Sequence, residues 1–158
     1  MGVRRIDAER AKELLDADEG YVFVDVRTEE EFLEGHIPTA RNIPLYRRGA
    51  GGIGLLWNNE FQVVMEQSFE KGDKIILGCH KGGRSAKAAD LLAATGFSNL
   101  FDMRGGFLGE TDIFGNITFP GWVTRGFEAT KECCPTDLYR HPVAEVSGQG
   151  AGGGRKRR

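Results

Sequence analysis

The chain has few cysteines, few prolines and no long hydrophobic run, and each shortage excludes a class of protein. Three cysteines and five prolines stand among 158 residues. So few cysteines cannot form a disulfide scaffold, and a reducing compartment is expected. No stretch approaches the ~18 consecutive apolar residues of a transmembrane helix, and the N-terminus lacks the apolar segment of a secretory signal. We therefore expect a cytoplasmic protein with no membrane partner.

The chain also has little net charge. Its formal charge is −2, and the last four residues, 155–158, are all basic, which leaves −6 on the other 154 residues. A body of that sign binds nucleic acid poorly, so we expect no nucleic-acid partner. Hydrophobic residues make up 40% and charged residues 28% of the chain, which is typical of a folded globular protein.

Glycine, in contrast, is abundant, with 23 residues in the chain, about twice the usual share. Many glycines lie in the last dozen residues, where the composition cannot bury a core. The length predicts a single domain. We therefore divide the chain into one domain over residues 1–130, a peripheral segment over 131–146 and a disordered, Gly-rich basic tail over 147–158.

Apolar runs alternate with helical patterns along the domain. Strands are predicted over residues 21–26, 74–77 and 97–102, with a short extended piece over 40–43. Helices are predicted over 8–16 with Asp7 as N-cap, from Thr28 to 34, from about Asn58 or Asn59, over 84–95, and near 123–130. Residues 45–57 are expected to form an irregular loop. The alternation indicates an α/β layer fold with a mainly parallel sheet, in which functional sites gather at the carboxyl ends of strands.

The segment 79–85, Cys-His-Lys-Gly-Gly-Arg-Ser, carries the strongest chemical signal. A cysteine leaves a buried strand and passes through a six-residue loop into a helix, where successive amides can face inward as an anion nest. Gly82 and Gly83 permit backbone conformations that a Cβ forbids. The helix N-terminus and the side chains of His80, Lys81 and Arg84 add positive potential. These features favour the thiolate of a partly exposed Cys79, which suits a nucleophile.

Each of these residues also has a plainer interpretation. Cys79 can be a small buried hydrophobic residue at a strand end. Arg84 can pair with a carboxylate that fixes the loop. Asp25 and Arg27 leave a strand toward the same edge of the sheet and can orient the loop, but a buried ion-pair network is favoured. Cys133 and Cys134, with only His141 nearby, lack the spacing of a zinc site, and no metal or organic cofactor is indicated.

At this loop the sequence resembles the rhodanese family. The family pattern Cys-x-x-Gly-x-Arg matches residues 79–84, and Gly-Gly-Phe at 105–107 resembles a further signature. Upstream, residues 25–38 and 40–44 look like the N-terminal signature of the family, and the glycine-rich stretch at 46–56 is most like plant-type single-domain members. Two departures stand out: Thr39 occupies a position where the family often has Gly, and residues 108–121 look like an insertion, with Glu110 in place of an aromatic residue.

The resemblance implies a three-layer fold with a mainly parallel five-stranded sheet and helices on both faces. It also implies sulfane-sulfur transfer through a persulfide on Cys79, without a cofactor. The expected partners are thiosulfate or a similar donor, and cyanide, a thiol or a protein thiol as acceptor. His80, Lys81, Gly82, Gly83 and Arg84 are then the substrate-binding residues. Asp25, Arg27 and Ser85 are supporting residues.

Two other functions stay open. Plant-like relatives with a similar loop are associated with arsenate reduction, which here needs Cys133 or Cys134 as a resolving thiol. A module that carries sulfur to a protein partner without catalysis is the other alternative. Four residues separate Cys79 from Arg84, against five in phosphatases of the same fold. This smaller ring suits sulfur better than a tetrahedral phosphate, and we predict no useful phosphomonoesterase activity.

Overall fold

The computed structural model describes residues 2–52 and 54–132. Its centre is a five-stranded sheet whose order is β1-β7-β6-β2-β3, with every neighbouring pair parallel. The strands are β1 (Val3–Ile6), β2 (Val22–Asp25), β3 (Arg41–Asn42), β6 (Ile75–Gly78) and β7 (Leu100–Met103). The three central strands are buried almost throughout, as expected for a sheet that is covered on both faces. The predicted fold class is confirmed.

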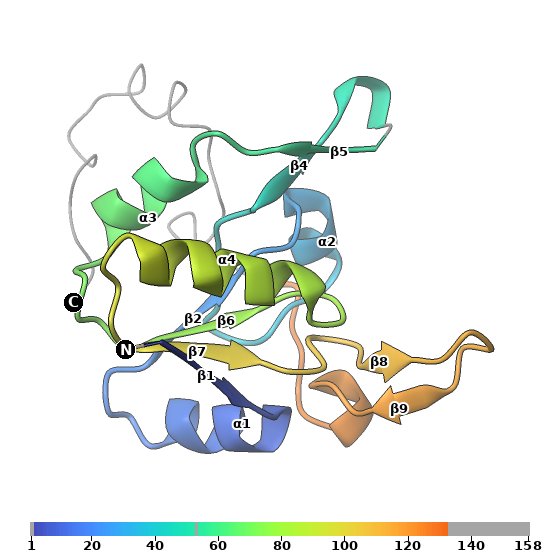
Figure 1. The fold of residues 1–158 in the computed structure, drawn as a ribbon. Coiled ribbons are helices and arrows are strands. Elements are labelled where there is room, and N and C mark those ends of the chain that lie inside the picture. Colours follow the sequence, from blue (N-terminus) through green and yellow to red (C-terminus); the bar gives the residue numbers. More distant parts are fainter. Residues whose placement is uncertain (1, 53, 133–158) are drawn as a thin grey trace.

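Helices cover both faces of this sheet (Figure 1). On one face lies α1 (Ala8–Asp16), and on the other lie α3 (Phe61–Ser68) and α4 (Gly83–Ala94). The buried side chains form two clusters accordingly. One contains Phe61, Met65 and Leu92 from α3 and α4. The other contains Ala11 of α1 together with Phe32 of the short helix α2 (Glu29–Glu34). The sheet is therefore the middle layer of three.

The helix starts follow the local sequence signals. Asp7 caps α1 by accepting a hydrogen bond from the Arg10 N–H. Thr28 and Glu31 form a capping box at the start of α2, because each side chain accepts from the backbone N–H of the other residue. Asn58 is not the cap of α3, although its side chain accepts from the Glu60 N–H just before that helix.

Two predicted irregular regions contain β-hairpins instead. In residues 45–57, β4 (Tyr46–Arg48) pairs with β5 (Leu55–Trp57) around the 3₁₀ turn η1 (Ala50–Gly52). Beyond β7, β8 (Glu110–Thr111) pairs with β9 (Ile117–Phe119). The strands are only two or three residues long and mostly exposed. They are therefore shorter than the run of ~4–8 alternating residues that predicts a strand.

Other expectations need smaller corrections. The first strand, β1, was not predicted, because its centre is two exposed arginines and its pairing with β7 depends on tertiary structure. Thr95, the last residue of the helix predicted over 84–95, is the exposed C-cap that follows α4. The predicted last helix is the short 3₁₀ helix η2 (Val123–Arg125). Cys133, Cys134, His141 and the tail lie outside the described residues, so the division of the chain at 130 and 146 stays a prediction.

Candidate active site

The segment 79–85 connects the carboxyl end of β6 to the start of α4. Cys79 follows the last residue of β6, and α4 begins at Gly83, so only residues 79–82 form a loop before the helix. Cys79 is 3% exposed, which corrects the expectation of a partly exposed thiol. The burial follows from its position at the end of a strand that is covered on both faces.

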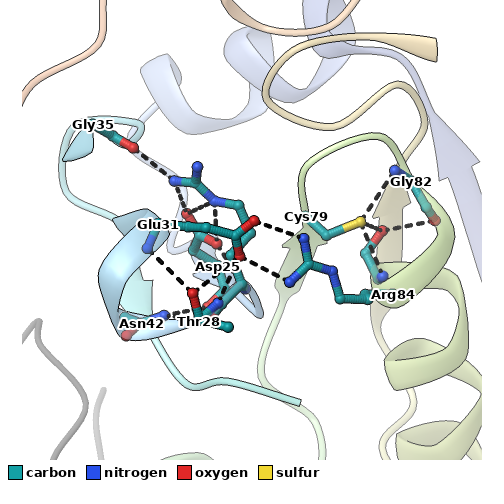
Figure 2. Close-up of polar contacts among 10 residues, drawn as sticks. Asp25, Thr28, Glu31, Gly35, Asn42, Cys79, Gly82 and Arg84 are labelled. Atoms are coloured by element: carbon teal, nitrogen blue, oxygen red, sulfur yellow. Dashed lines mark hydrogen bonds and ion pairs between the residues drawn. The ribbon is translucent and has the colours of Figure 1, made fainter. Parts of the chain in front are cut away.

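Two backbone N–H groups point at the sulfur of Cys79. The Gly82 N–H donates to Sγ at 3.1 Å and the Ser85 N–H at 3.3 Å (Figure 2). In the same turn, the first N–H groups of α4 have no carbonyl partner within the helix. The sulfur therefore lies at the positive end of a 12-residue helix.

Of the two glycines at positions 82 and 83, only one has a backbone conformation that requires glycine. Gly82 has φ +126°, a conformation that L side chains rarely adopt. Gly83 has no positive φ and has open space where a Cβ would stand. The expectation that both glycines are needed for conformation is therefore correct for Gly82 and wrong for Gly83, because Gly83 already lies in the first turn of α4.

The Gly-Gly-Phe motif holds the outer side of the loop. The Phe107 N–H donates to the Cys79 carbonyl at 2.7 Å, and the Leu108 N–H donates to the His80 carbonyl at 3.0 Å. A Cβ on Gly106 would lie 2.5 Å from the Cys79 carbonyl oxygen, so only glycine permits this approach. Because these carbonyls are held from outside the loop, its N–H groups are free to turn toward the sulfur. The sequence reasoning missed this role, although the paired glycines were its signal.

Arg84 is paired with Glu31 of α2. Its guanidinium donates two hydrogen bonds to the Glu31 carboxylate, at 2.8 and 3.0 Å, and is turned toward that residue in Figure 2. Burial alone raises the pKa of Glu31, but the hydrogen bonds from Arg84 and from the Thr28 backbone, with the charges of Arg84 and Arg27, lower it to about 2. The ion-pair alternative considered for Arg84 is thus the arrangement found.

The other two predicted cationic side chains are Lys81 and His80. Lys81 is exposed, and its Nζ donates to Thr111 Oγ1 on β8 at 3.1 Å. His80 is half-buried, and burial together with the nearby charges of Arg27, Arg84 and Lys81 lowers its pKa despite the opposing charge of Glu31. A neutral His80 adds little positive charge to the site.

Asp25 and Arg27 form a buried ion pair at the end of β2. Arg27 donates to both carboxylate oxygens of Asp25 at 2.8–3.1 Å and to the Gly35 carbonyl at 2.7 Å. Its guanidinium also lies 4.5 Å from the centre of the Phe107 ring. The pair therefore connects β2 with the segment that holds the Cys79 loop.

Asp102, at the end of β7, was not predicted as a site residue. Ser85 Oγ donates to Asp102 Oδ1 at 2.6 Å, and the Cys79 thiol lies 3.5 Å from the same Ser85 oxygen. Arg5 of β1 donates to the other oxygen of Asp102 at 3.2 Å. Burial, aided by the charge of Asp90, raises the pKa of Asp102 against the opposing effects of Ser85 and Arg5. The register of β6 with β7, which places Leu77 beside Asp102, brings this carboxyl to the loop.

The described residues, 2–52 and 54–132, contain neither a group of metal-binding side chains nor a membrane-spanning helix. No cluster of three or more His, Cys, Asp or Glu residues suitable for a metal ion occurs in that part of the chain. No helix there has the length and apolar content needed to span a bilayer.

Comparison with known proteins identifies the class to which this fold and loop belong. The model of the rhodanese-like domain family matches residues 7–109. The chain therefore belongs to the rhodanese-like domain family.

Curated relatives agree with this assignment. The chain is 42% identical to thiosulfate sulfurtransferase 16, chloroplastic, of Arabidopsis thaliana over 88 residues, which cover 56% of this chain and 72% of that protein. It is 30% identical to protein HIGH ARSENIC CONTENT 1, mitochondrial, of the same plant over 137 residues, which cover 86% of this chain and 70% of the relative. The match covers only 54% of the longer senescence-associated protein DIN1 of Raphanus sativus.

A solved structure supports the fold. The crystal structure of Rv0390 from M. tuberculosis superposes with a TM-score of 0.69 and covers 84% of this chain and all of that one. At 22% identity, this likeness concerns the fold alone.

The relatives overturn the predicted cytoplasmic location. Four of them carry the word chloroplastic in their names. The prediction was wrong because it took a default from composition. Few cysteines are compatible with any reducing compartment, so the composition does not distinguish one such compartment from another.

Proposed function

We propose that this protein is a thiosulfate sulfurtransferase that carries sulfane sulfur as a persulfide on Cys79. The observation that carries the proposal is the pair of backbone N–H groups, from Gly82 and Ser85, that donate to Sγ at the start of α4. Backbone donors fixed in this way stabilise a sulfur anion before any substrate arrives. The names of relatives such as thiosulfate sulfurtransferases 16 and 18 support the same activity.

The reaction divides into two displacements at sulfur. The Cys79 thiolate attacks the outer sulfur of thiosulfate, the S–S bond of thiosulfate breaks, and sulfite leaves with the bonding electrons. A nucleophilic acceptor such as cyanide or a thiol then attacks the outer sulfur of the persulfide and regenerates the thiolate. The persulfide is anionic, and the N–H groups of the first turn of α4 offer it hydrogen bonds.

Both cations of the loop already have partners: Arg84 pairs with Glu31, and Lys81 donates to Thr111. In the unliganded protein they therefore contribute positive potential, and neither is positioned to bind the donor directly. Cys79 is nearly fully buried, which favours a small anionic donor over a bulky phosphate ester. We therefore expect no phosphomonoesterase activity.

The test is intact mass spectrometry after incubation with thiosulfate. We expect the wild-type chain to gain one sulfur atom and the Cys79→Ser variant to gain none, because serine cannot form the persulfide. A Cys133→Ser, Cys134→Ser double variant is the matched control and should load as wild type does. Loading that persists in Cys79→Ser contradicts the proposal. Turnover with cyanide then separates an enzyme from a module that only carries sulfur.

Arsenate reduction is the second candidate, favoured by the match to protein HIGH ARSENIC CONTENT 1 over 86% of this chain. In that reaction Cys79 attacks arsenic and an arsenate oxygen leaves as water. A second thiol then attacks Cys79 Sγ and forms a disulfide, while the electrons of the As–S bond reduce As(V) to As(III), which leaves as arsenite. Cys133 and Cys134 are the candidate thiols of the chain, and glutathione is the candidate outside it. Arsenite production from arsenate with glutathione, lost in Cys79→Ser, supports this activity. No arsenite from a chain that loads sulfur excludes it.

A further inference from the structure

A hydrogen-bonded chain of three side chains leads away from the sulfur of Cys79. Sγ lies 3.5 Å from Ser85 Oγ, and Ser85 Oγ lies 2.6 Å from Asp102 Oδ1. Ser85 is fully buried and Asp102 is 1% exposed. The chain of contacts therefore crosses the interior from the end of β6, through the first turn of α4, to the end of β7.

The hydroxyl of Ser85 has one proton to donate and two lone pairs to accept with. Two acceptors lie near it, Asp102 Oδ1 at 2.6 Å and the Gly82 carbonyl at 3.2 Å. The shorter contact, to the carboxylate, takes the proton, because an ionised carboxylate only accepts and is the stronger acceptor. A lone pair of the same oxygen is then available to the Cys79 thiol, which donates to it. This arrangement fits the thiol form of Cys79. A thiolate in the same place needs the opposite polarity at Ser85.

We propose that Ser85 and Asp102 form a proton relay that accepts the proton of the Cys79 thiol. The S–H bond of Cys79 breaks and its proton bonds to Ser85 Oγ, while the original O–H bond of Ser85 breaks and that proton bonds to Asp102 Oδ1. No electron is gained or lost. The products are a thiolate that accepts a hydrogen bond from Ser85 and a neutral Asp102 that donates one to Ser85. The relay rests on the proposed function, because it supplies the thiolate which that function uses.

The surroundings of Asp102 favour its neutral form more than those of Glu31 do. Arg5 of β1 donates to Asp102 through a side chain that is 55% exposed, so solvent screens its charge. Asp90 of α4 opposes ionisation. On the other side of the sulfur, Arg84 adds positive potential but is neutralised by Glu31. Burial raises the pKa of Asp102, which makes it a better proton acceptor.

A cavity gives the proton an exit. Asp102 is one of the residues that line a cavity of about 540 Å³ at the start of α4, together with the charged residues Arg5, Lys81, Asp90 and Glu110. Cys79 is not among its lining residues. The nucleophile and the proton therefore have separate environments: the sulfur faces the N–H groups of the loop, while Asp102 borders the cavity.

The test measures how fast iodoacetamide alkylates Cys79 as a function of pH, with peptide mass spectrometry to separate Cys79 from Cys133 and Cys134. We expect Ser85→Ala and Asp102→Asn each to slow alkylation at neutral pH by about tenfold or more, since a positioned base contributes at least that much. The rates should converge with wild type well above the usual thiol range near ~8.5, where no acceptor is needed. The exposed residues Ser98 and Asp16 supply the matched controls, Ser98→Ala and Asp16→Asn, which should follow the wild-type profile.

A double variant distinguishes a relay from two structural effects. Because Asp102 acts through Ser85, the Ser85→Ala, Asp102→Asn chain should react no more slowly than Ser85→Ala alone. Asp102→Asn keeps an oxygen that accepts from Ser85, and circular dichroism will show whether it folds. If it does not fold, Ser85→Ala alone decides. A wild-type pH profile in either folded variant overturns the relay.

The outcome is independent of sulfur transfer. Alkylation needs only the thiolate, so the relay stands if the profiles shift as expected while thiosulfate fails to load Cys79. In that case only the proposed function fails. If thiosulfate loads Cys79 but the profiles do not shift, the relay fails and the function stands.

Discussion

Cys79 lies between two acidic residues that the fold treats in opposite ways. Glu31 receives two hydrogen bonds from a guanidinium, and its pKa falls to about 2. Asp102 receives one hydrogen bond from a hydroxyl and one from an exposed arginine, and its pKa rises. Burial alone would raise both, so the number and charge of the donors decides the direction. Glu31, whose pKa is lowered, holds structure through its ion pair with Arg84. Asp102, whose pKa is raised, can exchange a proton.

The largest effect is expected from a change at the Gly82 N–H, the backbone donor to Cys79 Sγ. Gly82→Ala places a Cβ at φ +126°, which costs about 1–2 kcal/mol or forces the Gly82 N–H away from Sγ. We expect the rate of persulfide formation from thiosulfate to fall about a hundredfold, as on loss of an oxyanion donor. The measurement is a time course by intact mass.

Gly83→Ala is the matched control, since Gly83 has an ordinary φ and open space at its Cβ position. We expect loading within about twofold of wild type, because alanine also favours the helix. Equal rates in the two alanine variants contradict the role assigned to the Gly82 N–H.

The Glu31 side is tested by its effect on stability. Glu31→Gln should lower the free energy of unfolding at pH 7 by roughly 2–3 kcal/mol. A fall in pKa from 4.5 to about 2 corresponds to ~3.4 kcal/mol, and solvent screening reduces this for a side chain that is 26% exposed. The folded-state pKa is depressed, so this stability is present above about pH 4.5 and is lost as the pH falls toward 2. Urea unfolding at several pH values gives the difference between the two proteins.

Two controls sharpen the comparison. Glu30→Gln changes an exposed neighbour on α2 and should leave the free energy of unfolding within about 0.5 kcal/mol. Asp102→Asn should give the opposite pH trend, because a carboxyl with a raised folded-state pKa loses stability as the pH rises through that pKa. A constant gap between wild type and Glu31→Gln down to low pH removes the ion pair as the cause.

The smallest expected effect is at Thr39, which contacts neither Glu31 nor Asp102 through any hydrogen bond described above. Thr39 has φ +69°, which is strained for a β-branched residue. Thr39→Gly should raise the free energy of unfolding by about 0.5–1 kcal/mol, because the relief of strain exceeds the entropy cost of glycine. Thermal unfolding measures it. Thr39→Ala keeps a Cβ and should gain less, and equal gains count against strain. Neither change should alter sulfur loading.

The sequence predicted most of what is local in this molecule. The caps at Asp7 and Thr28, the buried central strands and the turn from Cys79 into α4 depend on neighbouring residues, and the structure has all of them. The family resemblance supplied the five-stranded sheet and the departure at Thr39. That departure has a physical reason, because the backbone there adopts a conformation that glycine tolerates best.

What the sequence did not predict depends on strand register and on contacts between distant residues. Asp102 reaches Ser85 because β6 and β7 are neighbours in register, and Arg5 reaches Asp102 because β1 adds to the edge beside β7. Glu31 and Arg84 are 53 residues apart. Such pairs have no spacing signal, so a single sequence can suggest their residue types but not their partners.

Phe107 and Leu108 donate hydrogen bonds to the carbonyls of Cys79 and His80. The Cys79 loop can therefore reach its final geometry only after residues 105–108 have folded against it. A nascent chain that ends after α4 already contains Cys79, but it lacks the Phe107 and Leu108 N–H groups that hold the loop carbonyls. The sulfur chemistry must therefore wait until residues 105–108 have docked.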